Sequence, residues 1–267
     1  MEVYGGVSIS PQIDHLRRAD VVVGTPGRLL DHLSRGTLIT SHIRILVLDE
    51  ADKMFEMGFI DDLRRIMSRI PSHSQKLLFS ATMSADILEI AKRHMNNPER
   101  VKMQSYVDEK KLIQYYYEVE RRNKFSLLVH LLKKEARGLT LIFCSTRHIV
   151  DLVNRNIQKQ KIQSEALHGG MTQNRRTQVM EEYRNGKLDV LVASDVAARG
   201  LDIKNVNLII NYDLPKTSQE YVHRIGRTAR AGEEGKVISL LSPEDHENFS
   251  RVLEDRSLLV QKIDTPR

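Results

Sequence analysis

Three carboxylates within four residues follow directly on a short apolar run. The run spans 43–48, is interrupted only by Arg44, and is followed by Asp49, Glu50 and Asp52. Such a run predicts a buried parallel strand, and ligand crevices of open α/β sheets lie at the carboxyl ends of strands. Adjacent acids at that edge can hold hydrated Mg²⁺ and orient an attacking water. The alternative is an acidic helix N-terminus, which the helix dipole favours by itself.

Basic side chains cluster in the segment 218–230. A helix is predicted here with Ser218 as its N-cap, and it would place His223, Arg227 and Arg230, at i, i+4 and i+7, on one face. Two guanidiniums directed at one point suit a phosphoryl group in transfer, because its negative charge is being redistributed. The alternative is a solvent-exposed basic face. The opposite, apolar side of this helix is expected to present Tyr221, Val222 and Ile225.

A polar turn with a glycine follows the apolar run 190–193. The turn begins at Ser194, contains Gly200 and ends at Asp202. Glycine permits close approach of the backbone to a ligand, and a carboxylate at the end of such a turn could accept hydrogen bonds from a ribose. The alternative is an ordinary strand-to-helix turn.

The elements that must position these residues alternate along the chain. Short apolar runs are separated by amphipathic segments, which predicts parallel sheets with right-handed crossovers. In the first part a helix is expected over 59–70 and strands at 20–23, 43–48 and 76–79. In the second part strands are expected at 115–119, 139–144, 190–193, 208–211 and 237–241. We therefore predict two α/β domains, 1–104 and 111–267, joined by a linker at 105–110.

Composition narrows the class of protein. The chain has 267 residues, 40% of them hydrophobic and 28% charged, as in soluble globular proteins. No apolar run reaches the roughly 18 residues that span a bilayer. No secretory leader follows Met1, and Cys144 is expected to be buried and inert, so a reducing cytoplasm fits. The protein is expected to be a monomer. The net charge of +6 permits a polyanionic partner such as a nucleic acid.

Taken together, these segments resemble the motifs of one known family. Asp49-Glu50-Ala51-Asp52 is the tetrapeptide that names the DEAD-box RNA helicases, ATP-dependent members of helicase superfamily two. Further strings resemble the family's other motifs in the family's order: Gly5-Gly6, Thr25-Pro26-Gly27-Arg28, Ser80-Ala81-Thr82, Ile142 to Arg147, His168 to Met171 with Gln173 and Arg176, Asp195 to Asp202, and His223 to Arg230. The resemblance covers nearly the whole chain and implies two RecA-like domains in tandem.

The resemblance implies roles in ATP hydrolysis. Asp49 would hold Mg²⁺ through water, and Glu50 would position or deprotonate the water that attacks the γ-phosphate. Arg227 and Arg230 would be arginine fingers that stabilise charge on the phosphates. Further contacts to the nucleotide would come from Gly200 and Asp202.

The resemblance also implies coupling between the nucleotide and RNA. Asp52 would pair with His223 across the two domains, while Ser80 and Thr82 would link the nucleotide state to the grip on RNA. Contacts to RNA, mainly to its sugar-phosphate backbone, would come from Gly5, Gly6, Thr25, Gly27, Arg28, Thr146, Gln173, Arg176 and Ser194. Backbone contacts carry no sequence information, so low sequence specificity is expected.

Two features depart from the family pattern. Ala229 stands where the family usually has Gly, a small-for-small change expected to leave the arginine fingers usable. The phosphate-binding pattern G-x-x-x-x-G-K-[ST] does not occur in the sequence, and in the family it precedes the position where this chain begins. The first domain is therefore expected to be N-terminally truncated, with exposed apolar faces and unpaired strand edges. The second domain is expected to be whole and to fold alone.

Three functional hypotheses follow. The first is an ATP-dependent RNA helicase, favoured by the joint presence of Asp49, Glu50, His223, Arg227 and Arg230. The second is a non-catalytic RNA-binding or scaffold protein, favoured by the missing loop, without which this chain alone is expected to hydrolyse ATP poorly or not at all. A DNA helicase of the same superfamily is less favoured, because the Asp-Glu-Ala-Asp and Ser-Ala-Thr strings resemble the RNA branch.

Overall fold

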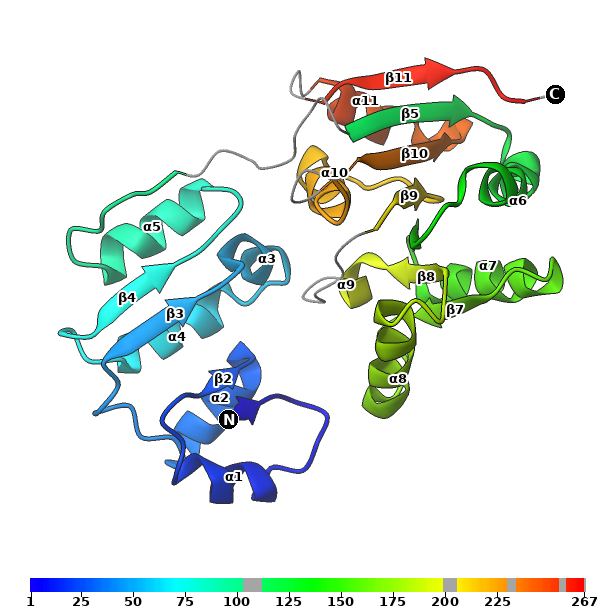
Figure 1. The fold of residues 1–267 in the computed structure, drawn as a ribbon. Helices are drawn as coiled ribbons and strands as arrows, with labels where there is room; N and C mark the ends of the chain where they lie inside the picture. Colours follow the sequence, from blue (N-terminus) through cyan, green and yellow to red (C-terminus); the bar gives the residue numbers. More distant parts are fainter. Residues whose placement is uncertain (103–111, 199–205, 230–233, 255–257, 267) are drawn as a thin grey trace. The chain divides into compact units, whose positions relative to one another are not determined.

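The chain divides into two compact units, Met1–Lys102 and Met103–Arg267 (Figure 1). The computed structural model describes residues 1–102, 112–198, 206–229, 234–254 and 258–266. Within these ranges every strand pair of both units runs parallel, so the predicted α/β class with parallel sheets is confirmed. Across the same ranges no helix combines the length and the apolar character needed to cross a membrane.

The first unit holds two separate two-stranded sheets. β1 (Glu2–Val3) pairs with β2 (Val23–Gly24), and β3 (Ile45–Leu48) pairs with β4 (Gln75–Leu78). The helices are α1 (Ser10–Leu16), α2 (Pro26–Ser34), α3 (Ala51–Glu56), α4 (Ile60–Arg69) and α5 (Ala85–His94). The strand expected at 20–23 is largely wrong, because β1 offers only two residues for pairing and Val23 alone of that range joins it.

Helices cover one face of the β3–β4 sheet. The buried cluster on that face consists of Leu48 from β3, Leu63 and Met67 from α4, and Ile90 from α5. The alternate residues Ile45 and Val47 are 57% and 50% exposed. The expectation of a buried strand over 43–48 is therefore wrong for one face, because a strand presents every second residue to the side that these helices do not cover. The apolar exposure expected for this domain is observed.

The second unit is built on one seven-stranded parallel sheet in the order β11-β5-β10-β9-β6-β8-β7. The strands are β5 (Leu112–Glu118), β6 (Thr140–Cys144), β7 (Ser164–Leu167), β8 (Val190–Ser194), β9 (Leu208–Asn211), β10 (Gly235–Leu241) and β11 (Val260–Ile263). All five predicted strands are present within a few residues. β7 and β11 are additional, because their short sequences Ser-Glu-Ala-Leu and Val-Gln-Lys-Ile lack a continuous apolar run.

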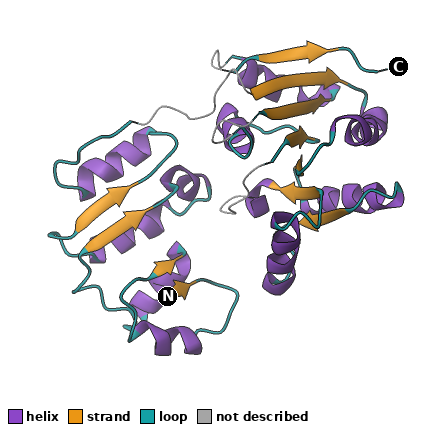
Figure 2. Ribbon diagram, viewed as in Figure 1, coloured by secondary structure: helices purple, strands orange, loops and turns teal. Residues whose placement is uncertain are grey.

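Helices cover both faces of this sheet (Figures 1 and 2). One face packs against α6 (Lys124–Glu135) and α7 (Arg147–Lys159), and the other against α8 (Gln173–Arg184), α10 (Ser218–Ile225) and α11 (His246–Leu253). The short helix α9 (Asp195–Ala198) follows β8, and 3₁₀ turns lie at η1 (Arg121–Asn123) and η2 (Pro243–Asp245). Burial on both faces explains the apolar run from Leu141 to Cys144 in β6.

Threonine caps begin the helices at the carboxyl edge of the sheet. The side chains of Thr146, Thr172 and Thr217 accept hydrogen bonds from the backbone N–H of Ile149, Arg175 and Glu220, at 3.2, 3.4 and 3.1 Å. The N-cap expected at Ser218 is therefore wrong by one residue. The helix expected over 218–230 ends at Ile225, because Gly226 is its C-cap and the Thr228 hydroxyl donates to the carbonyl of Val206.

Candidate functional site

The first two acids of the carboxylate cluster lie directly after β3, at its carboxyl end. Asp49 is exposed, and its Oδ1 accepts a hydrogen bond from the N–H of Glu50 at 2.9 Å. Glu50 has a left-handed backbone with φ of 52°, a conformation that is costly for a residue with a Cβ and that clusters at functional sites. Its carboxylate lies 2.5 Å from Nζ of the buried Lys53. The carboxylate nominated to orient water is thus held beside an ammonium group.

Asp52 joins the acid cluster to the loop after β4. It is only 4% exposed, and its Oδ2 accepts hydrogen bonds from the N–H and hydroxyl of Thr82 at 3.0 and 3.3 Å. Ser80 Oγ accepts from the Asp52 N–H at 3.3 Å and donates to the Thr82 carbonyl at 2.5 Å. Asp52 Oδ1 also accepts from the N–H of Lys53 at 3.0 Å, the helix N-terminal role that the alternative predicts. The structure therefore brings Asp52, Ser80 and Thr82 together.

Pairing of β1 with β2 brings the glycine pair close to the start of α2. The Thr25 N–H donates to the Val3 carbonyl at 3.0 Å, and Gly5-Gly6 follows β1 almost directly. Thr25 is the N-cap residue of α2, and both it and Gly27 are exposed there. Backbone N–H groups at a helix start suit the binding of phosphate. These two predicted RNA-binding motifs are thus neighbours in the first unit.

Arg28 fastens the glycine-bearing loop to the helices. Its Nη2 donates to the Val7 carbonyl at 3.0 Å and its Nη1 donates to Gln12 Oε1 at 3.2 Å. The same Gln12 oxygen lies 3.1 Å from Nε2 of His32, and Gln12 Nε2 donates to the Tyr4 carbonyl at 3.1 Å. Burial lowers the pKa of His32, and the charge of Arg28 lowers it further. Sequence patterns give no signal for the buried Gln12 and His32, because polar residues in amphipathic helices are usually exposed.

The predicted RNA-binding residues of the second unit gather at the carboxyl edge of its sheet. Ser194 ends β8, whose neighbours are β6 and β7, and Thr146 caps the helix that follows β6. Gln173 is exposed at the start of α8, the helix that follows β7. Arg176 of the same helix donates from Nη2 to the Ala197 carbonyl at 2.8 Å and so ties α8 to α9. The structure therefore places Ser194 at the end of β8 and the other three residues at the starts of the helices that follow β6 and β7.

The basic residues of α10 are arranged differently from the predicted helix face. Val222 is 37% exposed, whereas Arg224 is only 3% exposed and its guanidinium pairs with Asp195 at 2.7 Å. His223 is half-buried, and the half-buried Arg227 lies in the turn beyond the helix. The prediction of one continuous basic face is wrong, because the helix ends at its C-cap. The expected partners Asp52 and His223 belong to different units, and their pairing stays a prediction. Outside the described residues lie Arg230, Gly200 and Asp202.

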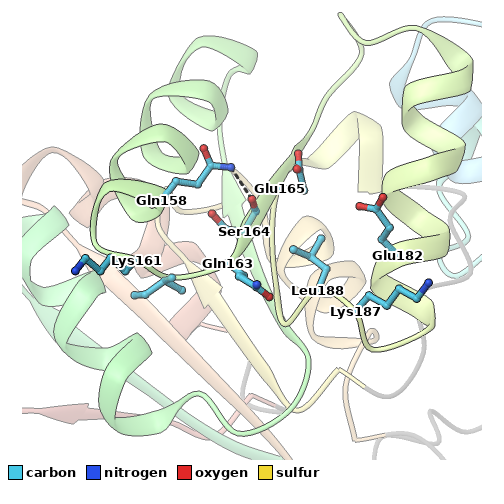
Figure 3. Close-up of a pocket in the computed structure, with 9 residues that line it drawn as sticks. Gln158, Lys161, Gln163, Ser164, Glu165, Glu182, Lys187 and Leu188 are labelled. Atoms are coloured by element: carbon cyan, nitrogen blue, oxygen red, sulfur yellow. Dashed lines mark hydrogen bonds between the residues drawn. The ribbon is translucent and has the colours of Figure 1, made fainter.

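A hollow of about 550 Å³ opens in the second unit, at the amino edge of the seven-stranded sheet, opposite to the edge that carries the predicted site residues (Figure 3). Its wall includes Ser164, where β7 begins, and Leu188, which precedes β8. The Ser164 carbonyl accepts a hydrogen bond from Gln158 Nε2 at 2.8 Å. None of the predicted site residues lines this hollow. Because ligands of open α/β sheets bind at the carboxyl ends of strands, we do not assign it to the predicted chemistry.

Asp49 has the chemistry and exposure to face a hydrated Mg²⁺. Among the residues that the structure describes, no three His, Cys, Asp or Glu side chains gather around one point. Mg²⁺ usually keeps several waters and takes one or two carboxylates together with substrate phosphates, so it needs no such cage. An exposed carboxylate at a strand end fits that kind of water-mediated contact.

Cys144 is buried as predicted, and burial raises the pKa of its thiol.

The sequence of this chain matches known protein families and relatives. The family described as DEAD/DEAH box helicase matches residues 1–90, and the helicase conserved C-terminal domain matches residues 123–232. The ATP-dependent RNA helicase CshA of Listeria monocytogenes is 44% identical over 96% of this chain and 49% of its own length. The DEAD-box ATP-dependent RNA helicase CshA of Geobacillus kaustophilus is 43% identical over 92% of this chain and 53% of its own length. The chain spans about half the length of these curated relatives.

Solved structures of similar proteins cover both units. A DEAD box protein from the hyperthermophile Methanococcus jannaschii is 37% identical, with a TM-score of 0.55 over 98% of this chain and 71% of that chain. Dbp5 of S. cerevisiae, bound to RNA and ADP BeF3, is 27% identical, with a TM-score of 0.85 over 99% of this chain and 70% of that chain. The RecA-like architecture implied by the motifs is therefore confirmed.

Proposed function

Because the chain belongs to the DEAD/DEAH box helicase family, we propose that it is part of an ATP-dependent RNA helicase that locally unwinds or remodels RNA duplexes. The observation that carries the proposal is the Asp52–Ser80–Thr82 network. It joins the acid cluster at the end of β3 to the loop after β4, so a displacement of the phosphate-facing acids would move that loop as well. The relatives named above, whose names describe RNA helicases, support the same assignment.

The proposed reaction is attack of water on the γ-phosphorus of ATP, which breaks the bond to the β-phosphate oxygen and yields ADP and inorganic phosphate. Glu50 orients the water and takes its proton, after exchanging its contact with Lys53 for the water. Asp49 would hold Mg²⁺ through water, and the ion, when bound, would supply positive charge beside the phosphates. Arg227 and Arg230 stabilise the charge that is redistributed as the phosphoryl group transfers.

RNA binding is proposed at the strand ends of both units. The exposed Thr146 and Gln173, with Ser194 and Arg176, would contact the sugar-phosphate backbone at the second sheet. The glycine pair and the start of α2 would do so in the first unit. Contacts of this kind release counterions, so affinity should fall with rising salt and vary little with sequence.

The proposed function is tested by the ATPase rate of the protein purified from its own cells, measured with and without single-stranded RNA. RNA should raise the rate, and Glu50→Gln should lower it by at least about a hundred-fold, because the water then lacks its base. Glu99→Gln makes the same chemical change at an exposed position and should leave the rate unchanged. A rate that is indifferent to both RNA and Glu50→Gln would contradict the proposal.

The second candidate is an RNA-binding or scaffold protein without nucleotide turnover. One observation favours this candidate: the pattern G-x-x-x-x-G-K-[ST] does not occur in the 267 residues. In proteins that have this pattern, the loop supplies the backbone N–H groups and the lysine that bind the β-phosphate. The isolated 267-residue chain is therefore expected to hydrolyse ATP poorly or not at all. A robust RNA-stimulated rate from this chain, lost in Glu50→Gln, would overturn that expectation and exclude the scaffold.

A further inference from the structure

The guanidinium of Arg224 is the meeting point of several strand ends in the second unit. Its Nε and Nη2 donate to Asp195 Oδ1 and Oδ2, each at 2.7 Å, in a bidentate pair. Its Nη1 donates to Asn211 Oδ1 at 2.8 Å and to the Asp213 carbonyl at 2.7 Å. The cation also lies 4.8 Å from the centre of the Phe143 ring. One side chain of α10 thus contacts the first residue of α9, the last residue of β9 and an aromatic ring of β6.

The partners of Arg224 make hydrogen bonds and ion pairs to further elements of the unit. Asp213 Oδ2 accepts hydrogen bonds from the N–H and hydroxyl of Ser145 at 2.8 and 2.9 Å, directly before the cap of α7. Asn211 Nδ2 donates to Ser239 Oγ at 3.0 Å, which reaches β10. The residues expected to contact RNA, Thr146 and Ser194, are therefore the immediate neighbours in sequence of Ser145 and Asp195. Both of these belong to the network of Arg224.

We propose that Arg224 is a positioning residue: it holds the RNA-facing strand ends at Ser194 and Thr146 in one fixed geometry with α10, which carries His223 and leads into Arg227. The inference rests on the proposed function, since it concerns how the RNA-facing and phosphate-facing residues of one unit are held in fixed positions relative to one another. Arg224 itself is buried, so it contacts neither ligand and acts through the groups it orients.

The chemistry of the network fits positioning better than general stabilisation. A planar fork that satisfies a carboxylate bidentately fixes both distance and angle, which a point charge cannot do. Buried ion pairs often contribute little net stability compared with apolar replacements, yet leaving one partner unpaired is costly. The substitution Arg224→Lys keeps the charge and much of the volume while removing the fork. Its main effect should therefore be on the geometry of the strand ends.

Two measurements on the 267-residue chain test the inference. Hydrogen exchange followed in peptides 145–150 and 190–198 reports the order of the two strand ends. The internal reference is residues 128–135 of α6, because Lys124 at the start of this helix lies 4.0 Å from Asp213. Fluorescence anisotropy with a labelled oligouridine reports RNA affinity. The control variant Lys236→Gln breaks another cross-element ion pair of the same unit, the 2.6 Å contact to Glu135 at the opposite edge of the sheet. Asp195→Asn is a second variant, which removes charge from the other side of the fork.

In Arg224→Lys, exchange should accelerate at least about ten-fold in both peptides while that of residues 128–135 stays unchanged, and the Kd for RNA should rise at least about ten-fold. Asp195→Asn should do the same, and Lys236→Gln should leave the Kd unchanged. Wild-type exchange and affinity in Arg224→Lys, or equal acceleration in residues 128–135, would overturn the inference. If the wild-type chain binds no RNA, the proposed function fails for this chain, and the exchange data still decide whether Arg224 positions the strand ends.

Discussion

Ala229 is buried and adopts a left-handed backbone with φ of 52°. This conformation brings Cβ close to the following carbonyl oxygen, which costs about 1 kcal/mol for any residue but glycine. We therefore expect Ala229→Gly to raise the free energy of unfolding of the second unit by about 1 kcal/mol, measured by urea titration. Ala136→Gly is the matched control. Ala136 has an unstrained φ of −69°, so this substitution relieves no strain and only increases the conformational entropy of the unfolded chain, which lowers stability. If both variants are destabilised equally, strain at Ala229 is excluded.

His32 should make the first unit sensitive to mild acid. Burial, followed by the charge of Arg28, lowers the pKa of His32, so the folded state favours the neutral ring. The contribution of His32 to the free energy of unfolding is therefore fully present above its unfolded pKa of about 6.5. It is lost as the pH falls through that value toward the folded pKa. An NMR titration of the ring should give a midpoint below about 6.5. Arg28→Gln should raise the midpoint, and a wild-type midpoint at or above the unfolded value would contradict the account.

At the scale of elements, β3 has two unlike faces. Val47 is 50% exposed, whereas the next residue, Leu48, is 6% exposed and belongs to the buried cluster with α4 and α5. Val47→Thr should change the free energy of unfolding by less than about 0.5 kcal/mol, and Leu48→Ala should lower it by about 2 to 5 kcal/mol. Urea unfolding of the two variants checks the contrast. Similar losses at both positions would mean that the exposed face is covered in solution.

The central strands of the second sheet are predictable from sequence because both of their faces are buried, so each of β6, β8 and β9 is apolar at all but one of its residues. The edge strands β7 and β11 need no such run and give no comparable signal. The motifs single out Asp52, Ser80 and Thr82 as coupling residues, but they pair Asp52 with His223 and do not predict its hydrogen bonds to Thr82. They do not predict the Arg224–Asp195 pair, since an arginine in an amphipathic helix carries no sign of which way it faces.

At the scale of the whole molecule, the second unit carries its own core. The apolar side chains on the two faces of its sheet form two clusters that lie entirely within Met103–Arg267. A fragment of these residues should therefore fold alone and unfold in one cooperative thermal transition, because every strand of the sheet and its covering helices are included. Circular dichroism with calorimetry checks this. A fragment with helical signal but no cooperative transition would show that the core needs the first unit.

The measurement that tests the central claim most directly is displacement of one strand from a short RNA duplex by the protein purified from its own cells. With ATP and Mg²⁺ the wild-type protein should separate the strands, and Glu50→Gln should slow displacement by at least about a hundred-fold while still binding RNA. Binding of the duplex by the wild-type protein without any ATP-dependent displacement would contradict the helicase assignment and leave an RNA-binding scaffold in its place.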